Sequence, residues 1–575
     1  MIHKHKRYAQ VLAGVATLSM VAAACGSSSS KSATPSTKAP SSNTTTGPVP
    51  TGGTLTVGAE QEPDCMDWVG SCAGSSWGYW MAQVTTMPSA LIPLKQADGS
   101  YKYEPGPVLS GMPTLKTTPV QTITYNINPK AVWSDGVPIT CDDFKYTWQQ
   151  IATGKNIYDP TGYTGIANVD CTNEAQPVVT YKQGQTYSGW MQLFSAAYGI
   201  MPSHILSKGD RDTEMKNGYD WSGGPWFAKW TKGDNITLTP NTKYWGPKPK
   251  LDKVVFKIEA DTAAEFQAFK SNQVQALYPQ PQVDVISAIT SGSLPAGAHS
   301  IASAQTGAVE ALWIQNGKAP FNDKAVRQAV AYSIDRDAIV KQLFGGLGVN
   351  KAINSLNPFV LADYSDQNAF SNYKPDPAKV KSLMTGDGYT MQGGFWTKNG
   401  QKASFAISTT EQNKRRQLTL EALQGELKGA GFDVSLRFRS AADLFGKDGP
   451  NGDFQMALYA QQVTAIVPGL CAQFCTKNIP TAANNQTGNN WQRYSSPAAD
   501  KQLQIVDDSL DPAAQMAAAK SGDDILAADM ASLPIDPLPD ILLWSKNVVG
   551  PVSDNAIMGM FWNIDQWGCT GGSCS

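Results

Sequence analysis

Residues 133–148 read WSDGVPITCDDFKYTW and place three carboxylates, Asp135, Asp142 and Asp143, within nine positions. The Ser-Asp-Gly triplet is typical of a tight turn, because it follows an alternating run rich in β-formers. Thr140, three residues before Asp143, resembles the start of a capping box and predicts a helix over the rest of the stretch. Negative charge is favoured in the first turn of a helix. We therefore expect these carboxylates to build architecture rather than to do chemistry.

The size and composition of the chain predict a globular protein of two or more domains. At 575 residues the chain exceeds the length at which a single hydrophobic core stops growing. Removing Lys4, Lys6 and Arg7 with a leader lowers the 46 basic residues to 43, against 48 acidic ones, for a net charge of −5. This balance gives no support to nucleic acid or an anionic membrane surface as a partner.

The N-terminus carries a processing signal. Residues 1–24 combine a basic start with a short apolar run, which indicates a secretory signal peptide rather than a membrane span. Residues 25–50 are rich in Ser, Thr and Pro and predict a flexible tether. Cys25, at their junction, looks like the lipidated first residue of a bacterial lipoprotein. Because Ala22 stands where Leu is usual in such signals, cleavage without lipidation is the alternative.

The other eight cysteines form an even set in a chain that we expect to be exported, so disulfides are the default. Sequence proximity suggests four pairs, although about 105 connectivities are possible: Cys65–Cys72, Cys141–Cys171, Cys471–Cys475 and Cys569–Cys574. A zinc site is weakly supported, since only one pair comes near metal-ligand spacing.

Few residues are available for catalysis or metal binding. The chain has four histidines, two of them in the leader, and we expect His204 of MPSHIL to be structural because it follows a helix start. The sequence contains no G-x-S-x-G elbow and no phosphate-binding G-x-x-x-x-G-K-[ST] loop. We therefore predict no catalytic residues, no metal and no cofactor.

Three blocks of sequence carry a family resemblance. They are VWSDGVPITCDDF, GGPWFAKWTKGDNITLTPNTKYWGPKPKLDKVVFKI at 223–258, and FNDKAVRQAVAYSIDRDAIV at 321–340. In order, spacing and wording they resemble the extracytoplasmic solute-binding proteins of peptide-type ABC transporters, the oligopeptide- and dipeptide-binding family 5. In the second block, two β-rich runs joined by a Pro/Gly loop predict an antiparallel excursion. In the third, helical spacing of apolar residues leaves Arg327, Asp335 and Arg336 as expected surface or interdomain ion pairs.

The resemblance implies an α/β fold of the periplasmic-binding-protein-like (type II) class. Two hinged lobes, joined by two crossing strands, would close over a ligand buried in the cleft between them. We expect one discontinuous lobe from residues 51–90, 200–305 and 535–575. Residues 91–199 would form an inserted domain, and residues 306–534 the second lobe.

The same resemblance implies a function in solute capture without bond chemistry. The protein would bind oligopeptides or similar solutes and deliver them to an ABC permease, whose separate ATPase subunits supply the energy. It would be a monomer, lipid-anchored to the outer face of the bacterial cytoplasmic membrane. Two rival classes remain. One is a secreted hydrolase, which would be favoured by a histidine hydrogen-bonded to a Ser or carboxylate in the cleft. The other is a receptor or adhesin that keeps the fold but has lost transport.

Relatives bind the ligand backbone along extended segments of the cleft. By resemblance these would be Ala59, Glu60, Gln61 and Glu62 at the end of the first strand, and Tyr459, Ala460, Gln461 and Gln462 after DFQMAL. Trp313 is a candidate for either the pocket or the core. Relatives commonly carry Gly-Trp and then an Asp that pairs with the peptide amine, but this chain reads YAQQVTAIVPG there.

A buried ammonium without a carboxylate would cost several kcal/mol. Either Glu60 or Glu62 therefore receives the amine of a peptide, or the ligand has no free amine and is a sugar, a modified peptide or another small polar solute.

Overall fold

The computed structural model describes residues 48–70, 75–304 and 306–575, which all belong to the compact unit of residues 40–575. The expected signal peptide, Cys25, most of the expected tether and Cys72 lie outside the described residues.

The larger of two main sheets has seven strands in the order β12-β21-β11-β1-β10-β9-β8. β1 runs parallel to both β10 and β11, and the remaining neighbours are antiparallel. The β9–β10 pair confirms the antiparallel excursion predicted from the second sequence block. The bounds are β1 Thr54–Ala59, β8 Trp226–Thr231, β9 Asn235–Pro240, β10 Lys253–Ile258, β11 Ala276–Leu277, β12 His299–Ser303 and β21 Asp540–Trp544.

The second main sheet has five strands in the order β18-β17-β19-β13-β20. β13 is antiparallel to both its neighbours, whereas β17 is parallel to both of its own. Every residue of β13 is buried, as expected for a central strand covered on both faces. The bounds are β13 Ala308–Ile314, β17 Ser404–Thr410, β18 Asp433–Arg439, β19 Met456–Gln462 and β20 Ser532–Asp536.

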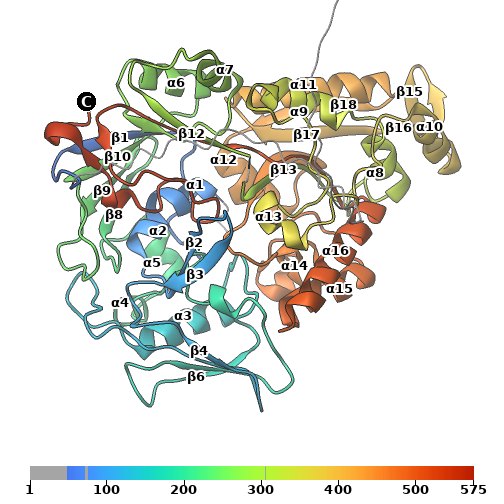
Figure 1. The fold of residues 1–575 in the computed structure, drawn as a ribbon. Coiled ribbons are helices and arrows are strands. Elements are labelled where there is room, and N and C mark those ends of the chain that lie inside the picture. Colours follow the sequence, from blue (N-terminus) through green and yellow to red (C-terminus); the bar gives the residue numbers. More distant parts are fainter. Residues whose placement is uncertain (1–47, 71–74, 305) are drawn as a thin grey trace, which may run out of the picture. The chain divides into compact units, whose positions relative to one another are not determined.

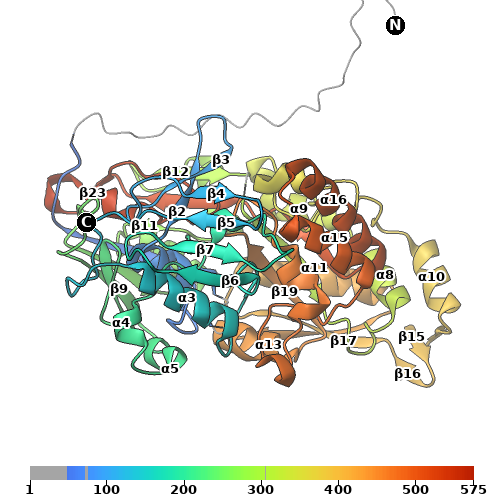
Figure 2. The ribbon, with the colours of Figure 1, turned by 90° about the horizontal axis from the view of Figure 1, so that it is seen from below.

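The described chain also forms four smaller sheets, of two to four strands each. A four-stranded antiparallel sheet, β4-β5-β7-β6, lies beside helix α3 (Figure 2). The bounds of the minor strands are β2 Leu91–Lys95, β3 Tyr101–Pro105, β4 Thr114–Lys116, β5 Thr122–Thr124, β6 Ile166–Asp170, β7 Val178–Tyr181, β14 Thr390–Gln392, β15 Phe395–Lys398, β16 Gln401–Lys402, β22 Val548–Val549 and β23 Gly568–Cys569.

Helices cover the sheets, and α15 and α16 lie side by side (Figure 1). The α-helices are α1 Ser76–Gly78, α2 Val84–Thr86, α3 Cys141–Thr153, α4 Ser203–Leu206, α5 Arg211–Met215, α6 Thr262–Lys270, α7 Val283–Ser291, α8 Lys324–Ala331, α9 Arg336–Phe344, α10 Pro377–Gly386, α11 Lys414–Gly429, α12 Ala441–Asp443, α13 Gly449–Asn451, α14 Leu470–Phe474, α15 Pro497–Asp508 and α16 Pro512–Asp529. Two π-helical turns are η2 Tyr79–Gln83 and η6 Leu444–Asp448. The 3-10 turns are η3 Trp190–Gln192, η4 Gly345–Leu347, η5 Phe359–Tyr364, η7 Thr476–Asn478, η8 Ala482–Asn484, η9 Ile564–Gln566 and η10 Thr570–Gly572.

The chain passes between the two main sheets twice. It leaves the seven-stranded sheet at Ser303 and enters the five-stranded sheet at Ala308. It returns between Asp536 and Asp540. All strands of the five-stranded sheet therefore lie in one continuous stretch of chain, whereas those of the seven-stranded sheet come from both sides of it.

The structure contains the helix and three of the disulfides that the sequence predicts. α3 begins with the capping box of Thr140 and Asp143, and Thr140 N–H donates to Asp143 Oδ2 at 2.9 Å. The disulfides are Cys141–Cys171, Cys471–Cys475 and Cys569–Cys574. The fourth suggested pair, Cys65–Cys72, stays a prediction because Cys72 is not described.

The expectation of surface or interdomain ion pairs in the third sequence block is wrong. Arg327 and Arg336 are buried, and their guanidinium groups donate mainly to backbone carbonyl oxygens, such as those of Asp529 and Ile353. Asp335 caps α9 by accepting the N–H of Ala338. A guanidinium has five donors in a fixed fork, so it can satisfy several carbonyls of irregular backbone at once.

Among the described residues, no helix combines the length and the apolar character that crossing a membrane requires.

Candidate functional site

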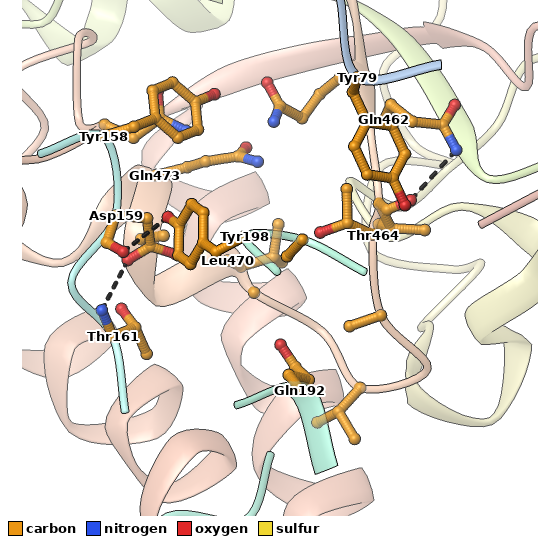
Figure 3. A pocket seen from close by; sticks show the side chains of 18 of the residues that line it. Tyr79, Tyr158, Asp159, Thr161, Gln192, Tyr198, Gln462, Thr464, Leu470 and Gln473 are labelled. Atoms are coloured by element: carbon orange, nitrogen blue, oxygen red, sulfur yellow. Dashed lines mark hydrogen bonds between the residues drawn. The ribbon is translucent and has the colours of Figure 1, made fainter. Parts of the chain in front are cut away.

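A pocket lies where four stretches of the chain meet, and it is the candidate site (Figure 3). We refer to it as the central pocket. It holds about 1320 Å³ of space between atoms, part of which is open to solvent. Its lining is drawn from residues 68–83, 158–198, 356–358 and 461–489. The site is therefore assembled by tertiary structure and corresponds to no continuous motif.

The first wall is a short helical segment that follows β1. The π-helical turn η2 carries Tyr79 and Gln83, which both line the pocket. Gln83 Nε2 donates to the carbonyl of Ala196 at 2.7 Å, which ties this wall to the segment 158–198. Single π-helical turns occur frequently at functional sites, because they displace a side chain from the regular helical positions.

The second wall is rich in tyrosine. Tyr158, Tyr163, Tyr187 and Tyr198 all line the pocket. The Tyr163 hydroxyl accepts the N–H of Phe194 at 2.7 Å, and the Tyr198 hydroxyl donates to the carbonyl of Asp159 at 2.6 Å. Burial raises the pKa of each of these four hydroxyls, and that of Tyr158 to about 12. The rings therefore stay neutral and are held in fixed orientations.

Asp159 supplies the one charged side chain among the described residues that line the central pocket. Its Oδ1 accepts the N–H of Thr161 at 2.9 Å. Burial raises the pKa of the Asp159 carboxyl, while hydrogen bonds from Thr161 and the positive charge of Lys477 oppose that rise. Asp159 makes no ion pair within 4.0 Å among the residues that the structure describes.

Side-chain amides complete the lining, at Gln83, Gln192, Asn357, Gln461, Gln462, Gln473 and Asn489. Gln473 is only 9% exposed, and its Oε1 has no hydrogen-bond partner among the described residues. Gln462 Nε2 donates to the carbonyl of Val463 at 3.1 Å. An amide presents both a donor and an acceptor, so the lining suits a polar solute.

The structure separates the predicted site residues of the second segment. Gln461 and Gln462 line the central pocket. Tyr459 and Ala460 precede them on β19 and do not line it. Trp313 is 1% exposed, donates from Nε1 to the carbonyl of Tyr459 at 2.8 Å and stacks on its ring at 5.3 Å. Trp313 therefore lies in the core behind the pocket.

The predicted residues of the first segment lie outside the lining. Gln61 comes nearest, since its Nε2 donates to Ser75 Oγ at 2.8 Å and Ser75 lines the pocket. Glu62 accepts the indole N–H of Trp230 at 2.8 Å. Ala59 and Glu60 are buried at the end of β1.

Glu60 belongs to a buried cluster of charges near the passages between the sheets. Its neighbours include Glu310, Arg415 and Arg416. Burial raises the pKa of Glu60, whereas the two guanidinium groups lower that of Glu310. Glu60 thus faces structural arginines, and Glu62 the indole of Trp230, rather than the pocket.

The histidine pair that would favour a hydrolase is not found in the central pocket, as far as the described residues show. His204 Nε2 lies 2.8 Å from Asp135 Oδ2, but neither residue lines the central pocket. No histidine belongs to the pocket lining within the described part of the chain.

Asp159 and the tyrosines of the second wall are pocket residues that the sequence analysis did not predict. They come from YDPTGYTG and the loops after it, where turn-forming residues surround aromatic ones. Aromatic and acidic residues within such a turn-rich segment are the available signal, because loops often carry binding residues.

Comparison with known proteins identifies the class. Residues 116–469, more than half of the chain, match the family described as bacterial extracellular solute-binding proteins, family 5 Middle. The chain belongs to this family, whose members are extracytoplasmic solute-binding proteins of ABC transporters. The resemblance read from the three sequence blocks is confirmed.

Two curated relatives show how far the similarity extends. The oligopeptide-binding protein OppA of Mycobacterium tuberculosis is 25% identical over 477 residues, which cover 80% of this chain and 76% of that protein. A putative ABC transporter peptide-binding protein of Brucella ovis is 25% identical over 453 residues, which cover 77% of this chain and 79% of the relative.

Solved structures confirm the type II periplasmic-binding-protein fold. The oligopeptide-binding protein AppA of Bacillus subtilis, in complex with a nonapeptide, matches with a TM-score of 0.78 at 18% identity, over 91% of this chain and 100% of AppA. The periplasmic EDTA-binding protein EppA matches with a TM-score of 0.77 at 22% identity, over 93% of this chain and 100% of EppA. Because the two neighbours bind different solutes, the shared fold does not define the ligand.

Proposed function

We propose that this protein is the lipid-anchored solute-binding component of an ABC importer, which captures an oligopeptide or a similar polar solute in the central pocket and delivers it to a membrane permease. The observation that carries the proposal is the pocket itself, whose lining comes from segments on both sides of the first passage between the main sheets. Membership of family 5 supports transport. The names of the curated relatives support a peptide as the ligand.

The two passages also support the proposed division into domains. The seven-stranded sheet draws its strands from residues 54–303 and 540–544, and the five-stranded sheet from residues 308–536. We propose that these sheets are the centres of two lobes that close over the pocket, and that residues 91–199 form an inserted domain. α7 packs against α9, so the lobes also touch outside the passages.

The first test removes the space in the pocket. Gly469 lines it, and a Cβ atom built there would meet no atom within 4 Å. We expect full-length wild-type protein to release a small molecule when it is isolated by native mass spectrometry and then denatured. Gly469→Trp should fold but retain little solute. Gly111→Trp is the matched control, because Gly111 has equally open surroundings and lies outside the pocket.

The masses that are released identify the ligand class. A ladder of masses that fit short peptides would support a peptide carrier. One sharp non-peptide mass would favour the alternative of a sugar or a modified peptide. Equal retention by Gly469→Trp and the wild type would contradict this pocket as the site.

The anchor is tested separately. If Cys25 is lipidated, Cys25→Ser should abolish the mass increase of the mature chain and release the protein from the membrane fraction. An unchanged distribution would contradict the anchor and leave the solute-binding proposal intact.

A further inference from the structure

The described lining of the central pocket carries an acidic side chain but no basic one. Its described lining contains the carboxylate of Asp159 and no lysine, arginine or histidine. The undescribed residues 71–74 and 305 also contain no charged side chain. An anionic group that enters this pocket would lose hydration without meeting a cation, and such burial is strongly unfavourable.

Asp159 is held in place from two sides. Its Oδ1 accepts the N–H of Thr161, and its backbone carbonyl accepts the hydroxyl of Tyr198. The carboxylate is therefore positioned without being neutralised by an ion pair. Figure 3 shows Asp159, Tyr158 and Tyr198 on one side of the pocket, and Tyr79 and Gln462 on the other.

The positive charge that acts on Asp159 is already shared. Lys477 lines a neighbouring pocket that has Thr161 and Tyr187 in common with the central one. The same neighbouring pocket contains Asp507 and Asp508, and Lys477 acts on both as well as on Asp159. One ammonium group faces three carboxyls, so the region around Asp159 remains an acceptor of positive charge.

A second acceptor points to the same kind of ligand. Gln473 is nine-tenths buried in the pocket wall, and its Oε1 has no partner among the described residues. A buried acceptor left without a donor costs free energy, so a bound N–H group would relieve it. The neutral tyrosine rings add faces that attract a cation.

We propose that the solute bound in the central pocket carries an ammonium group, that Asp159 and Gln473 accept its N–H donors, and that no anionic group of the solute lies inside the pocket. This inference rests on the proposed function and narrows it. A peptide would bind through its amine, with its carboxylate outside the pocket. The acid that pairs with the amine would thus be Asp159, in the segment 158–198. In relatives the corresponding Asp lies in the run that here follows Leu458.

The test compares probes of similar structure and different charge. Full-length protein is titrated with Ala-Ala-Ala-amide, its N-acetylated amide and the N-acetylated free acid, and in parallel with glucosamine, glucose and glucuronate. In the series that binds, we expect the cationic probe to bind about tenfold or more tightly than the neutral one, and the anionic probe to bind worst.

Asp159→Asn should remove the cationic advantage while keeping neutral binding, because Asn can still accept the N–H of Thr161. Gln473→Leu should weaken the binding of the cationic probe less than Asp159→Asn does. Asp98→Asn is the matched control: Asp98 Oδ1 accepts the N–H of Ser100 at 3.0 Å in the same geometry, outside the pocket. Thermal unfolding of each variant shows that it is folded.

Equal or tighter binding of the neutral or anionic probe would overturn the inference, and so would an unchanged charge preference in Asp159→Asn. If neither series binds, the solute released from wild-type protein is reacted with an amine-specific reagent, and a solute without an amine overturns the inference alone. Failure to retain or bind any solute would contradict the proposed function as well.

Discussion

Asp143 shows at the scale of a single residue what the carboxylates of residues 133–148 do. It is 1% exposed, and its Oδ2 accepts the N–H of Thr140 and the indole N–H of Trp133. Its Oδ1 accepts both the N–H and the hydroxyl of Ser203. One carboxylate thus caps α3 and joins it to the start of α4.

Asp143→Ala should therefore destabilise the protein severely. The change leaves one buried and two partly buried N–H groups and a hydroxyl without their acceptor, and we expect the free energy of unfolding to fall by about 2–4 kcal/mol. Chemical denaturation measures it. Asp142→Ala is the control, because this exposed neighbour shares only the first turn of the helix. Equal losses in the two variants would show that the buried contacts contribute nothing.

The two aspartates also mark the limit of prediction at this scale. The role of Asp143 could be predicted, because a capping box needs only local spacing. Asp159 could not, since a carboxylate becomes a binding group through its surroundings, and these come from residues far away in the sequence. Arg336 was mispredicted for the same reason: its distant carbonyl partners lie in loops whose course no local pattern defines.

At the scale of elements, the passages between the sheets meet at a buried ion cluster. Glu310 of β13 accepts from Arg416 Nε at 2.8 Å and lies 3.2 Å from Arg415 Nη1, both at the start of α11. Asp536, at the end of β20, pairs with Glu310 in the strand register. Both strands that enter and leave the five-stranded sheet are thereby tied to one helix.

Glu310→Gln should destabilise this junction by about 3–5 kcal/mol, because two buried guanidinium groups lose their counter-charge. Denaturant unfolding gives the change. Asp443→Asn, which weakens partly exposed ion pairs with Arg439 and Lys447, serves as the control and should change stability little. A Glu310→Gln variant as stable as that control would refute the structural role of the cluster.

The disulfides offer a graded prediction. Cys141–Cys171 joins the first residue of α3 to the residue after β6 across a separation of 30, whereas Cys569–Cys574 spans 5. If loop closure in the unfolded state dominates, replacing the first pair with serine should cost about 3–4 kcal/mol and the second about 2 kcal/mol. Thermal unfolding of the two double variants compares them, and the reverse order would reject this account.

Elements were easier to predict than contacts. The helix at residues 141–153 and the β9–β10 pair follow from periodicity and turn residues, which act over a few positions. The partition of Tyr459 and Gln461 between core and pocket lies beyond such patterns, because it depends on where β19 ends relative to the neighbouring segments.

At the scale of the whole molecule, buried carboxyls make stability depend on pH. Burial raises the pKa of Asp523 and of Asp540 to about 7 each, from the ordinary value of 3.8. Between these values the unfolded state releases protons that the folded state keeps, so stability falls as pH rises towards 7. Glu310 acts oppositely, because its lowered pKa stabilises the fold above pH 4.5 and that gain is lost at lower pH.

We therefore expect the melting temperature to be higher near pH 5 than near pH 8, with a free-energy difference of about 2–3 kcal/mol per raised carboxyl. Scanning calorimetry across this range tests it. Asp523→Asn should flatten the decline, because the amide does not titrate and can still accept the hydroxyl of Ser355. A melting temperature that rises steadily from pH 5 to pH 8 would contradict the prediction.

The family could be predicted from the sequence because the three blocks that carry the resemblance are structural segments, whose turns, strands and helices follow from residues close together in the chain. The ligand could not, since the pocket gathers residues 68 to 489 only after the chain has folded. No single stretch contains enough of the lining to reveal its charge.

The placement of β21 has a consequence for how the chain is made. Among the described strands β12 pairs with β21 alone, and β21 in turn pairs with β11. During synthesis or export, the five-stranded sheet is complete in sequence once Asp536 has emerged, but β12 must wait for residues 540–544. The seven-stranded sheet thus closes last, and until then its unpaired edge is open to pairing with other chains.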